Sequence, residues 1–242
     1  MRLSYRGTPF HGWQVQPHDT SVQQVIEEAL ATLLRVPTPV TGAGRTDAEV
    51  NARLMVAHFD TEKPIDDVPR LVHGLNALLP PDTAIYSISP VHDDAHARFD
   101  ATSRTYKYFA VTGKDPFRYP LSWKSPPDLD FDLMNKAAAR LLDYTDFTSF
   151  SKLHTDVKTN NCCITHAKWE QEDNQWVFTI TADRFLRNMV RAIVGTLVEV
   201  GRHKMTVEEF CQVIERKDRC AAGTSMPGHA LFLWDITYPF EF

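Results

Sequence analysis

The sequence lacks long hydrophobic runs: none of its segments approaches the about 18 consecutive apolar residues that a membrane-spanning helix needs. Its first ten residues, MRLSYRGTPF, also lack the apolar centre of a signal peptide. We therefore expect a cytoplasmic protein with no membrane partner. With 242 residues, of which 43% are hydrophobic and 24% charged, the chain has the composition of one large domain or two closely packed halves.

Cysteine is scarce and lacks the spacing of a metal site. The four cysteines, at positions 162, 163, 211 and 220, form no CxxC pair, and the ten histidines form no HExxH or HxE pattern. No GxxxxGK[ST] or GxGxxG segment is present to bind a nucleotide. We expect reduced, partly buried thiols, no metal and no cofactor.

Positive charge is also in short supply, with a net charge of −5, which argues weakly against a nucleic-acid partner. Two stretches are nevertheless locally basic. Residues 98–124 hold six Lys/Arg against two Asp, and residues 183–204 hold five against one Asp and one Glu. Charge alone allows two interpretations, a face that neutralises phosphates or a solvated surface of mixed charge.

Hydrophobic periodicity predicts the secondary structure. Residues 21–34 (SVQQVIEEALATLL) repeat apolar side chains with the period of a helix, and Ser21 with Gln24 forms a predicted capping box. The remaining predicted elements are strands at 2–5, 39–43, 54–60, 84–90, 104–112, 164–170, 176–182 and 231–238, and helices at 65–79, 131–142, 186–200 and 207–214.

The predicted order, β-α-β-β-α-β followed by a repeat with insertions, indicates an α+β fold made of two ferredoxin-like (split β-α-β) halves. We expect a pseudo-twofold relation between the halves, with their antiparallel sheets joined edge to edge into one continuous sheet beside a central cleft. We place the halves at residues 1–100 and 101–242. Residues 113–130, which hold four prolines, are predicted to be a long surface loop.

The segment TGAGRTDA, residues 41–48, carries two opposite charges at the tip of a predicted loop. Its glycines allow a sharp turn or a close approach to a ligand. Arg45 and Asp47 admit two interpretations at this point, a surface cation with a turn-capping carboxylate, or a functional pair.

Further motifs extend the pattern along the chain. They are YRGTPFHGWQVQP at 5–17, RFDATSRTYKY at 98–108, DFTSF at 146–150 and FLRNMVRAIVGTL at 185–197. Together with the GRTD segment, these motifs resemble, in order, those of the TruA family of tRNA pseudouridine synthases. The resemblance runs from Tyr5 to about Leu233.

The resemblance implies an isomerase that converts uridines at positions 38, 39 and 40, in the anticodon stem-loop of tRNA, to pseudouridine. The bond from ribose C1′ to uracil N1 breaks, the base rotates, and C1′ rejoins the base through C5, with neither a metal nor a cofactor. Asp47 is then the catalytic aspartate, which attacks C1′ or takes a ribose proton. The family members are homodimers, and we expect the same here.

The resemblance also implies roles for residues around Asp47. Arg191 is expected to pair with the aspartate and keep it ionised, and Arg45 to fill the space left by the flipped nucleotide. Tyr106 is expected to stack on the flipped base, although a strand tyrosine can also be plain sheet core. Leu231 is expected to pack on the base in the same pocket.

A further set of residues is expected to contact the tRNA backbone. It comprises Arg98, Phe99, Arg104, His154, Lys158 and Arg187.

Two departures from the family pattern follow the aspartate. The family usually has DAGVHA, whereas this chain has Glu49 and Asn51 in place of the glycine and the histidine. If position 49 needs a positive φ, Glu49 strains the loop. These departures are the sequence features that favour the alternative, a non-catalytic tRNA-binding or chaperone protein. A nucleoside-handling glycosidase is a third hypothesis.

Overall fold

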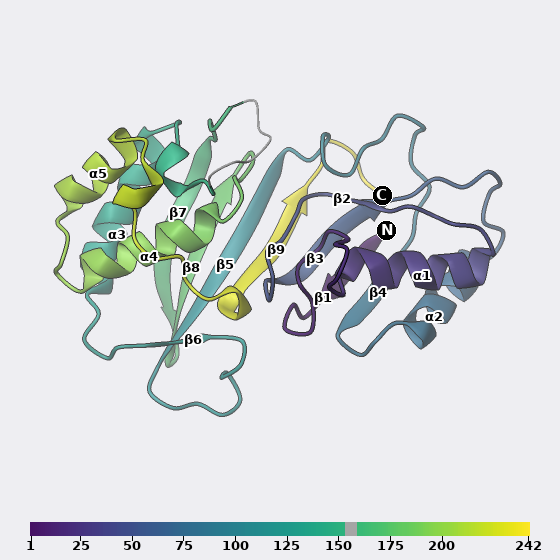
Figure 1. Cartoon of the computed structure of the whole chain (residues 1–242), viewed down its shortest axis with the longest axis horizontal. Helices are drawn as coiled ribbons and strands as arrows, with labels where there is room; N and C mark the ends of the chain where they lie inside the picture. The colour runs from purple at the N-terminus through teal and green to yellow at the C-terminus, as the bar shows by residue number, and fades with distance from the viewer. Residues whose placement is uncertain (153–158) are drawn as a thin grey trace. The chain divides into compact units, whose positions relative to one another are not determined.

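The computed structural model describes residues 1–152 and 159–242, and within them the chain forms two compact units. The first unit is Met1–Thr102 with Leu233–Phe242, and the second is Ser103–Phe232. The described residues form five α-helices and nine β-strands with largely antiparallel pairing, and Figure 1 shows how these elements are arranged within each unit. The α+β class is therefore confirmed. None of the described helices is long and apolar enough to cross a membrane.

The first unit has the predicted order β-α-β-β-α-β. Its elements are β1 (Arg2–Tyr5), α1 (Val22–Leu34), β2 (Thr41–Gly42), β3 (Asn51–His58), α2 (Val68–Leu78) and β4 (Thr83–Ser87). The sheet order is β4-β1-β3, and β9 (Leu231–Thr237) follows β3 with the residues that belong to this unit. Helices α1 and α2 lie on one face (Figure 1), where Leu3, Ile26, Met55 and Leu75 are fully buried.

The second unit is built on the antiparallel order β5-β8-β7. Its strands are β5 (Ser103–Thr112), β6 (Trp123–Ser125), β7 (Ile164–Glu172) and β8 (Gln175–Ala182). Its helices are α3 (Phe131–Arg140), α4 (Met189–Gly201) and α5 (Val207–Glu215), and they cover one face of this sheet (Figure 1). Tyr108, Trp169 and Phe178 fill the core beneath them.

Several predicted bounds need correction. Helix α2 begins at Val68 instead of residue 65, β2 spans only Thr41–Gly42 of the predicted 39–43, and β4 ends at Ser87 instead of residue 90. The expected loop at 113–130 contains a short strand, β6, which pairs in parallel with β5. The helix expected from residue 186 begins at Met189, because Asn188 takes a left-handed conformation with φ 67°. The strand expected from residue 54 begins at Asn51. Each error falls at the end of an element or in an insertion, where periodicity carries little information.

The predicted capping box of α1 forms only in part. Ser21 accepts a hydrogen bond from the Gln24 N–H, as expected, but the Gln24 side chain donates to Glu28 at 2.9 Å instead of returning to residue 21. The full reciprocal box occurs instead in α5, between Thr206 and Glu209, where it was not predicted from the sequence.

Candidate active site

The loop between β2 and β3 carries Asp47 and is fixed on both sides of it. The hydroxyls of Thr46 and Tyr5 are 2.8 Å apart, and both side chains are buried. The Thr46 carbonyl accepts a hydrogen bond from the Trp13 N–H at 3.3 Å, and the Asp47 carbonyl accepts one from the Val50 N–H at 3.2 Å. Asp47 itself is half-buried, so its backbone is held while its side chain stays accessible.

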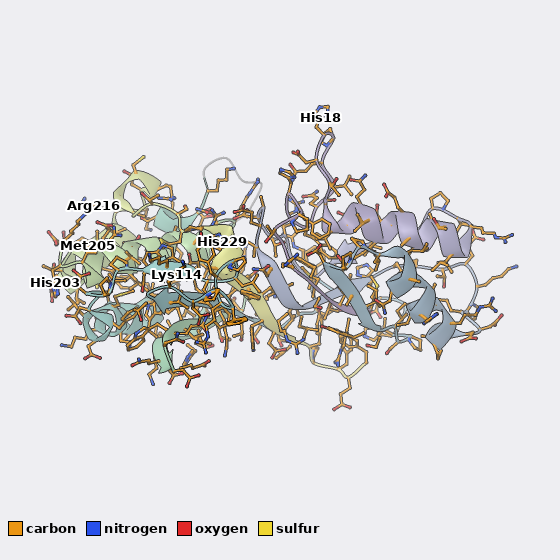
Figure 2. All side chains as sticks on the ribbon, turned by 90° about the horizontal axis from the view of Figure 1, so that it is seen from below. His18, Lys114, His203, Met205, Arg216 and His229 are labelled. Atoms are coloured by element: carbon orange, nitrogen blue, oxygen red, sulfur yellow. The ribbon has the colours of Figure 1, made fainter. Side chains whose placement is uncertain are left out.

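The N-terminal segment YRGTPFHGWQVQP supplies this support. Gly12 has φ +93°, and a Cβ there would lie 2.5 Å from the Thr46 carbonyl oxygen, so only glycine allows this approach. The Glu49 N–H donates to the Phe10 carbonyl at 3.2 Å. The supporting role of this motif was not predicted from the sequence, although the glycine beside the tryptophan is a signal that could have indicated it. His18 lies at the tip of the loop that follows the motif (Figure 2).

The two departures from the family pattern have structural consequences in this loop. Glu49 has φ 66°, so the condition under which a side chain at this position strains the loop is met. Asn51 is fully buried, and its Oδ1 accepts a hydrogen bond from the Gly7 N–H at 2.8 Å. Asn51 therefore joins β3 to the N-terminal segment that holds the Asp47 loop.

Arg45 is exposed at the tip of the same loop, two residues before Asp47. The first unit thus presents a cation and a carboxylate from one short segment whose backbone is fixed at Thr46. This arrangement suits a cation that contacts a polyanion and a carboxylate that acts beside it.

A second feature of the first unit is the segment that carries Arg98 and Phe99. Phe99 is 75% exposed, its ring centroid lies 4.2 Å from that of His96, and the Arg98 guanidinium carbon is 5.8 Å from the Phe99 ring centroid. His58 holds this segment in place, because its Nδ1 accepts a hydrogen bond from the Ala97 N–H at 3.1 Å. An exposed ring beside an arginine suits stacking on a base and contact with phosphate.

The surroundings of His58 favour its neutral form. Burial first, and the neighbouring charge of His96 second, lower the pKa of His58 below its ordinary value. A neutral Nδ1 is also what the hydrogen bond from Ala97 requires. The segment that carries Arg98 and Phe99 therefore depends on an uncharged histidine.

In the second unit, β5 positions Tyr106 and Arg104. The Tyr106 ring is half-buried and meets Phe185 edge to face, with centroids 5.1 Å apart. Arg104 donates from Nη1 to the Asp183 carbonyl at 2.8 Å, which ties β5 to the segment after β8. A half-buried tyrosine supported by a second ring is suited to stacking on a planar base.

Tyr108, two residues further on the same strand, is buried completely. Burial raises the pKa of its hydroxyl far above the ordinary value, and the charge of Arg191 opposes part of that rise. Its hydroxyl has no hydrogen-bond partner in residues 1–152 and 159–242. Tyr108 is therefore a core residue of the sheet, whereas Tyr106 is only half-buried.

Arg191 occupies the first turn of α4 and is half-buried. Its Nε donates to the Met226 carbonyl at 2.6 Å, and the Met226 N–H donates to the Arg191 carbonyl at 3.1 Å. Leu231 is 5% exposed at the start of β9, and Arg187 is exposed just before α4. The second unit thus carries Tyr106, Arg191 and Leu231, and the pairing of Arg191 with Asp47 stays a prediction.

Two predicted tRNA contacts, His154 and Lys158, lie outside the described residues. The four cysteines, all within the described ranges, are free thiols; Cys162 is buried and Cys211 half-buried, whereas Cys163 and Cys220 are exposed, so the expected burial holds for only two of them. In the same ranges no group of three or more His, Cys, Asp or Glu side chains is placed to hold a metal ion.

Comparison with known proteins identifies the family. The sequence profile described as tRNA pseudouridine synthase matches residues 137–239. The chain is 66% identical over 239 residues to the tRNA pseudouridine synthase A of Parabacteroides distasonis, covering 99% of this chain and 95% of the relative. Identity is 57% over 242 residues to the protein of the same name from Porphyromonas gingivalis (98% and 95% covered), and 40% over 240 residues to that from Bacillus subtilis (98% and 97% covered). Because similarity of this degree spans almost the whole of each chain, this protein belongs to the tRNA pseudouridine synthase A family, TruA.

Proposed function

We propose that this protein is a tRNA pseudouridine synthase that isomerises uridines at positions 38, 39 and 40, in the anticodon stem-loop, with Asp47 as its catalytic carboxylate. The proposal rests on sequence identity to proteins of that name, which extends over nearly the whole length of the chain. The Asp47 loop supports it, since its backbone is fixed by Tyr5 and Trp13 while the carboxylate stays half-exposed.

The reaction needs one carboxylate at the sugar. Asp47 attacks C1′ or removes a ribose proton, and the C1′–N1 electron pair leaves with the uracil. The uracil anion then rotates and C5 bonds to C1′, while the bond from Asp47 to C1′ breaks or the removed proton returns to the ribose. The proton on C5 passes to solvent and N1 takes up a proton, so one proton is lost and one is gained, and the product is an isomer of the substrate.

The other site residues bind and expose the nucleotide. Flipping the uridine costs a few kcal/mol, and stacking on Tyr106 recovers about 1–3 kcal/mol. Leu231 packs on the same base, and Arg45 occupies the space that the base leaves in the stem-loop. Arg191 pairs with Asp47 and keeps it anionic when bound RNA excludes water.

The proposal includes an arrangement of the chain. The two halves are ferredoxin-like, are related by a pseudo-twofold, and join their sheets beside a central cleft that takes the flipped uridine. Arg98, Phe99, Arg104 and Arg187 contact the tRNA outside that cleft. The protein acts in the cytoplasm as a homodimer.

Release of tritium from tRNA labelled at uracil C5 tests the chemistry, because rebonding through C5 must displace that atom. We expect release by the purified protein and none by the Asp47→Ala variant. No release by the intact protein, with tRNA still bound, would support a non-catalytic tRNA-binding protein instead. Free uracil among the products would indicate a glycosidase.

A further inference from the structure

The segment 219–226, which connects α5 to the last strand, lies directly against the first half of α4. A Cβ on Gly195 would clash with the Thr224 carbonyl oxygen, so the helix and the segment touch backbone to backbone at this glycine. The Gly223 N–H donates to the Thr196 hydroxyl at 2.9 Å. The 219–226 segment is therefore fixed against α4 at Gly195 and Thr196.

Arg191 contacts the end of this segment through two hydrogen bonds. Its Nε donates to the Met226 carbonyl at 2.6 Å, and its own carbonyl accepts from the Met226 N–H at 3.1 Å. A guanidinium is planar and rigid, so fixing Nε fixes the direction in which the two Nη groups point. The position of the Met226 carbonyl thus decides where Arg191 can meet an anion.

A second arginine, Arg219, holds the middle of the segment. Its Nη1 donates to the Gly223 carbonyl at 3.2 Å, and its Nη2 donates to the Ser225 hydroxyl at 2.8 Å. The Ser225 hydroxyl also accepts from the Asn188 side-chain amide at 2.6 Å, and Asn188 is the left-handed residue before the first turn of α4. Arg219 and Asn188 therefore both hydrogen-bond Ser225, the residue directly before Met226.

The DFTSF motif anchors the beginning of the segment. Ser149 is fully buried, its hydroxyl donates to the Val213 carbonyl at 2.6 Å, and it accepts from the Asp218 N–H at 2.9 Å. Asp146 accepts from Thr148 and pairs with Lys217 at 2.9 Å. A motif that the proposed chemistry leaves without a role thus fixes the residue before Arg219.

We propose that Arg219 is a positioning residue of the reaction, which orients Arg191 through Ser225 and the Met226 carbonyl. The inference rests on the proposed function, in which Arg191 pairs with Asp47. Arg219 itself touches neither the substrate nor the reacting atoms. Its guanidinium bonds neutral backbone and hydroxyl oxygens, so its contribution is the geometry of the 219–226 segment.

Kinetics of the Arg219→Gln variant test this inference, with tritium release as the assay. We expect kcat to fall by roughly ten- to a hundredfold, as for misplacement of a catalytic group by about 1 Å. KM for tRNA should change by less than about twofold, because Arg219 makes no substrate contact. Arg216→Gln is the matched control, since this exposed arginine points away from the ribbon (Figure 2) and should leave kcat unchanged.

A double-mutant cycle separates positioning from simple support of the fold. In an Arg191→Ala background, Arg219→Gln should change kcat by less than about twofold, because the group that it positions is gone. The same fold loss in both backgrounds would overturn the inference. If Arg219→Gln fails to fold, Ser225→Ala decides the question in the same cycle, since it removes one acceptor and leaves both arginines.

The two proposals fail in different ways. A wild-type protein that releases no tritium contradicts the proposed function. An active wild-type protein whose Arg219→Gln and Ser225→Ala variants fold and keep full kcat contradicts only the positioning role.

Discussion

The hydrogen bond between Tyr5 and Thr46 gives the sharpest stability prediction, because it links β1 to the residue before Asp47. The side chains are 4% and 9% exposed, and their oxygens are 2.8 Å apart. Tyr5→Phe removes one hydroxyl and keeps the ring. The net loss for a neutral hydrogen bond is about 0.5–1.5 kcal/mol, and a buried hydroxyl deprived of its partner costs about 1–3 kcal/mol. Because Thr46 keeps some access to water, we expect the free energy of unfolding to fall by about 1–2 kcal/mol.

Urea unfolding followed by tryptophan fluorescence measures this loss, with the midpoint shifted and the slope m unchanged. Tyr86→Phe is the control, since Tyr86 lies in the same unit, is 52% exposed, and bonds the Ser4 hydroxyl at 2.6 Å near the surface. That control should cost less than about 0.5 kcal/mol, because water replaces the lost partner. Equal losses in the two variants would refute the argument that burial of the Tyr5–Thr46 pair matters.

Three further predictions concern the same unit. Glu49→Gly should raise the free energy of unfolding in urea by about 0.5–1 kcal/mol, because φ 66° costs a side chain about 1–2 kcal/mol and the greater freedom of unfolded glycine offsets part of the gain; a less stable variant would contradict this. The pKa of His58 is lowered in the folded protein, so the unfolded chain binds the proton more tightly. The free energy of unfolding should therefore fall as pH drops from about 7 through the ordinary pKa near 6.5. In urea titrations the His58→Gln variant should show a weaker fall with pH, and an unchanged fall would exclude His58 as its cause. Phe99→Ala should weaken tRNA binding in filter assays by about five- to a hundredfold, equivalent to about 1–3 kcal/mol of stacking, with kcat at saturating tRNA unchanged; Phe117→Ala, at a ring 96% exposed in the second unit, is the control, and equal effects would remove the specific role of Phe99.

Local periodicity predicted most of the helices and strands. The apolar stripe of residues 21–34 corresponds to α1 (Val22–Leu34), and the first strand was predicted at β1 (Arg2–Tyr5) without error. The insertion at 113–130 was misread in part, because the three residues of β6 are too few to show an alternating pattern and pair with β5 only through the tertiary structure. The left-handed Asn188, which delays α4 to Met189, likewise interrupts an apolar stripe that continues on both sides of it.

The candidate site could be predicted only in its residue types. The GRTD segment and the tyrosine of RTYKY pointed to Asp47 and Tyr106 through resemblance, and the sequence alone left both with ordinary structural interpretations. The contacts that support the site could not be predicted from the sequence, because Tyr5 and Thr46 are 41 residues apart in the chain, and Arg191 and Met226 are 35 residues apart. Such pairs depend on packing of distant segments, which no local pattern records.

If the negative charge on Asp47 is what drives the isomerisation, the Asp47→Asn variant should lose that activity while still binding tRNA. This change keeps the size of the side chain and removes its negative charge, in a loop whose backbone is held at Thr46. With enzyme in excess over C5-tritiated tRNA, we expect the single-turnover rate to fall by about 10³-fold or more, while the Kd for tRNA stays within about threefold. A variant that binds tRNA normally and keeps more than about a tenth of the wild-type rate would show that the reaction does not need the negative charge of Asp47.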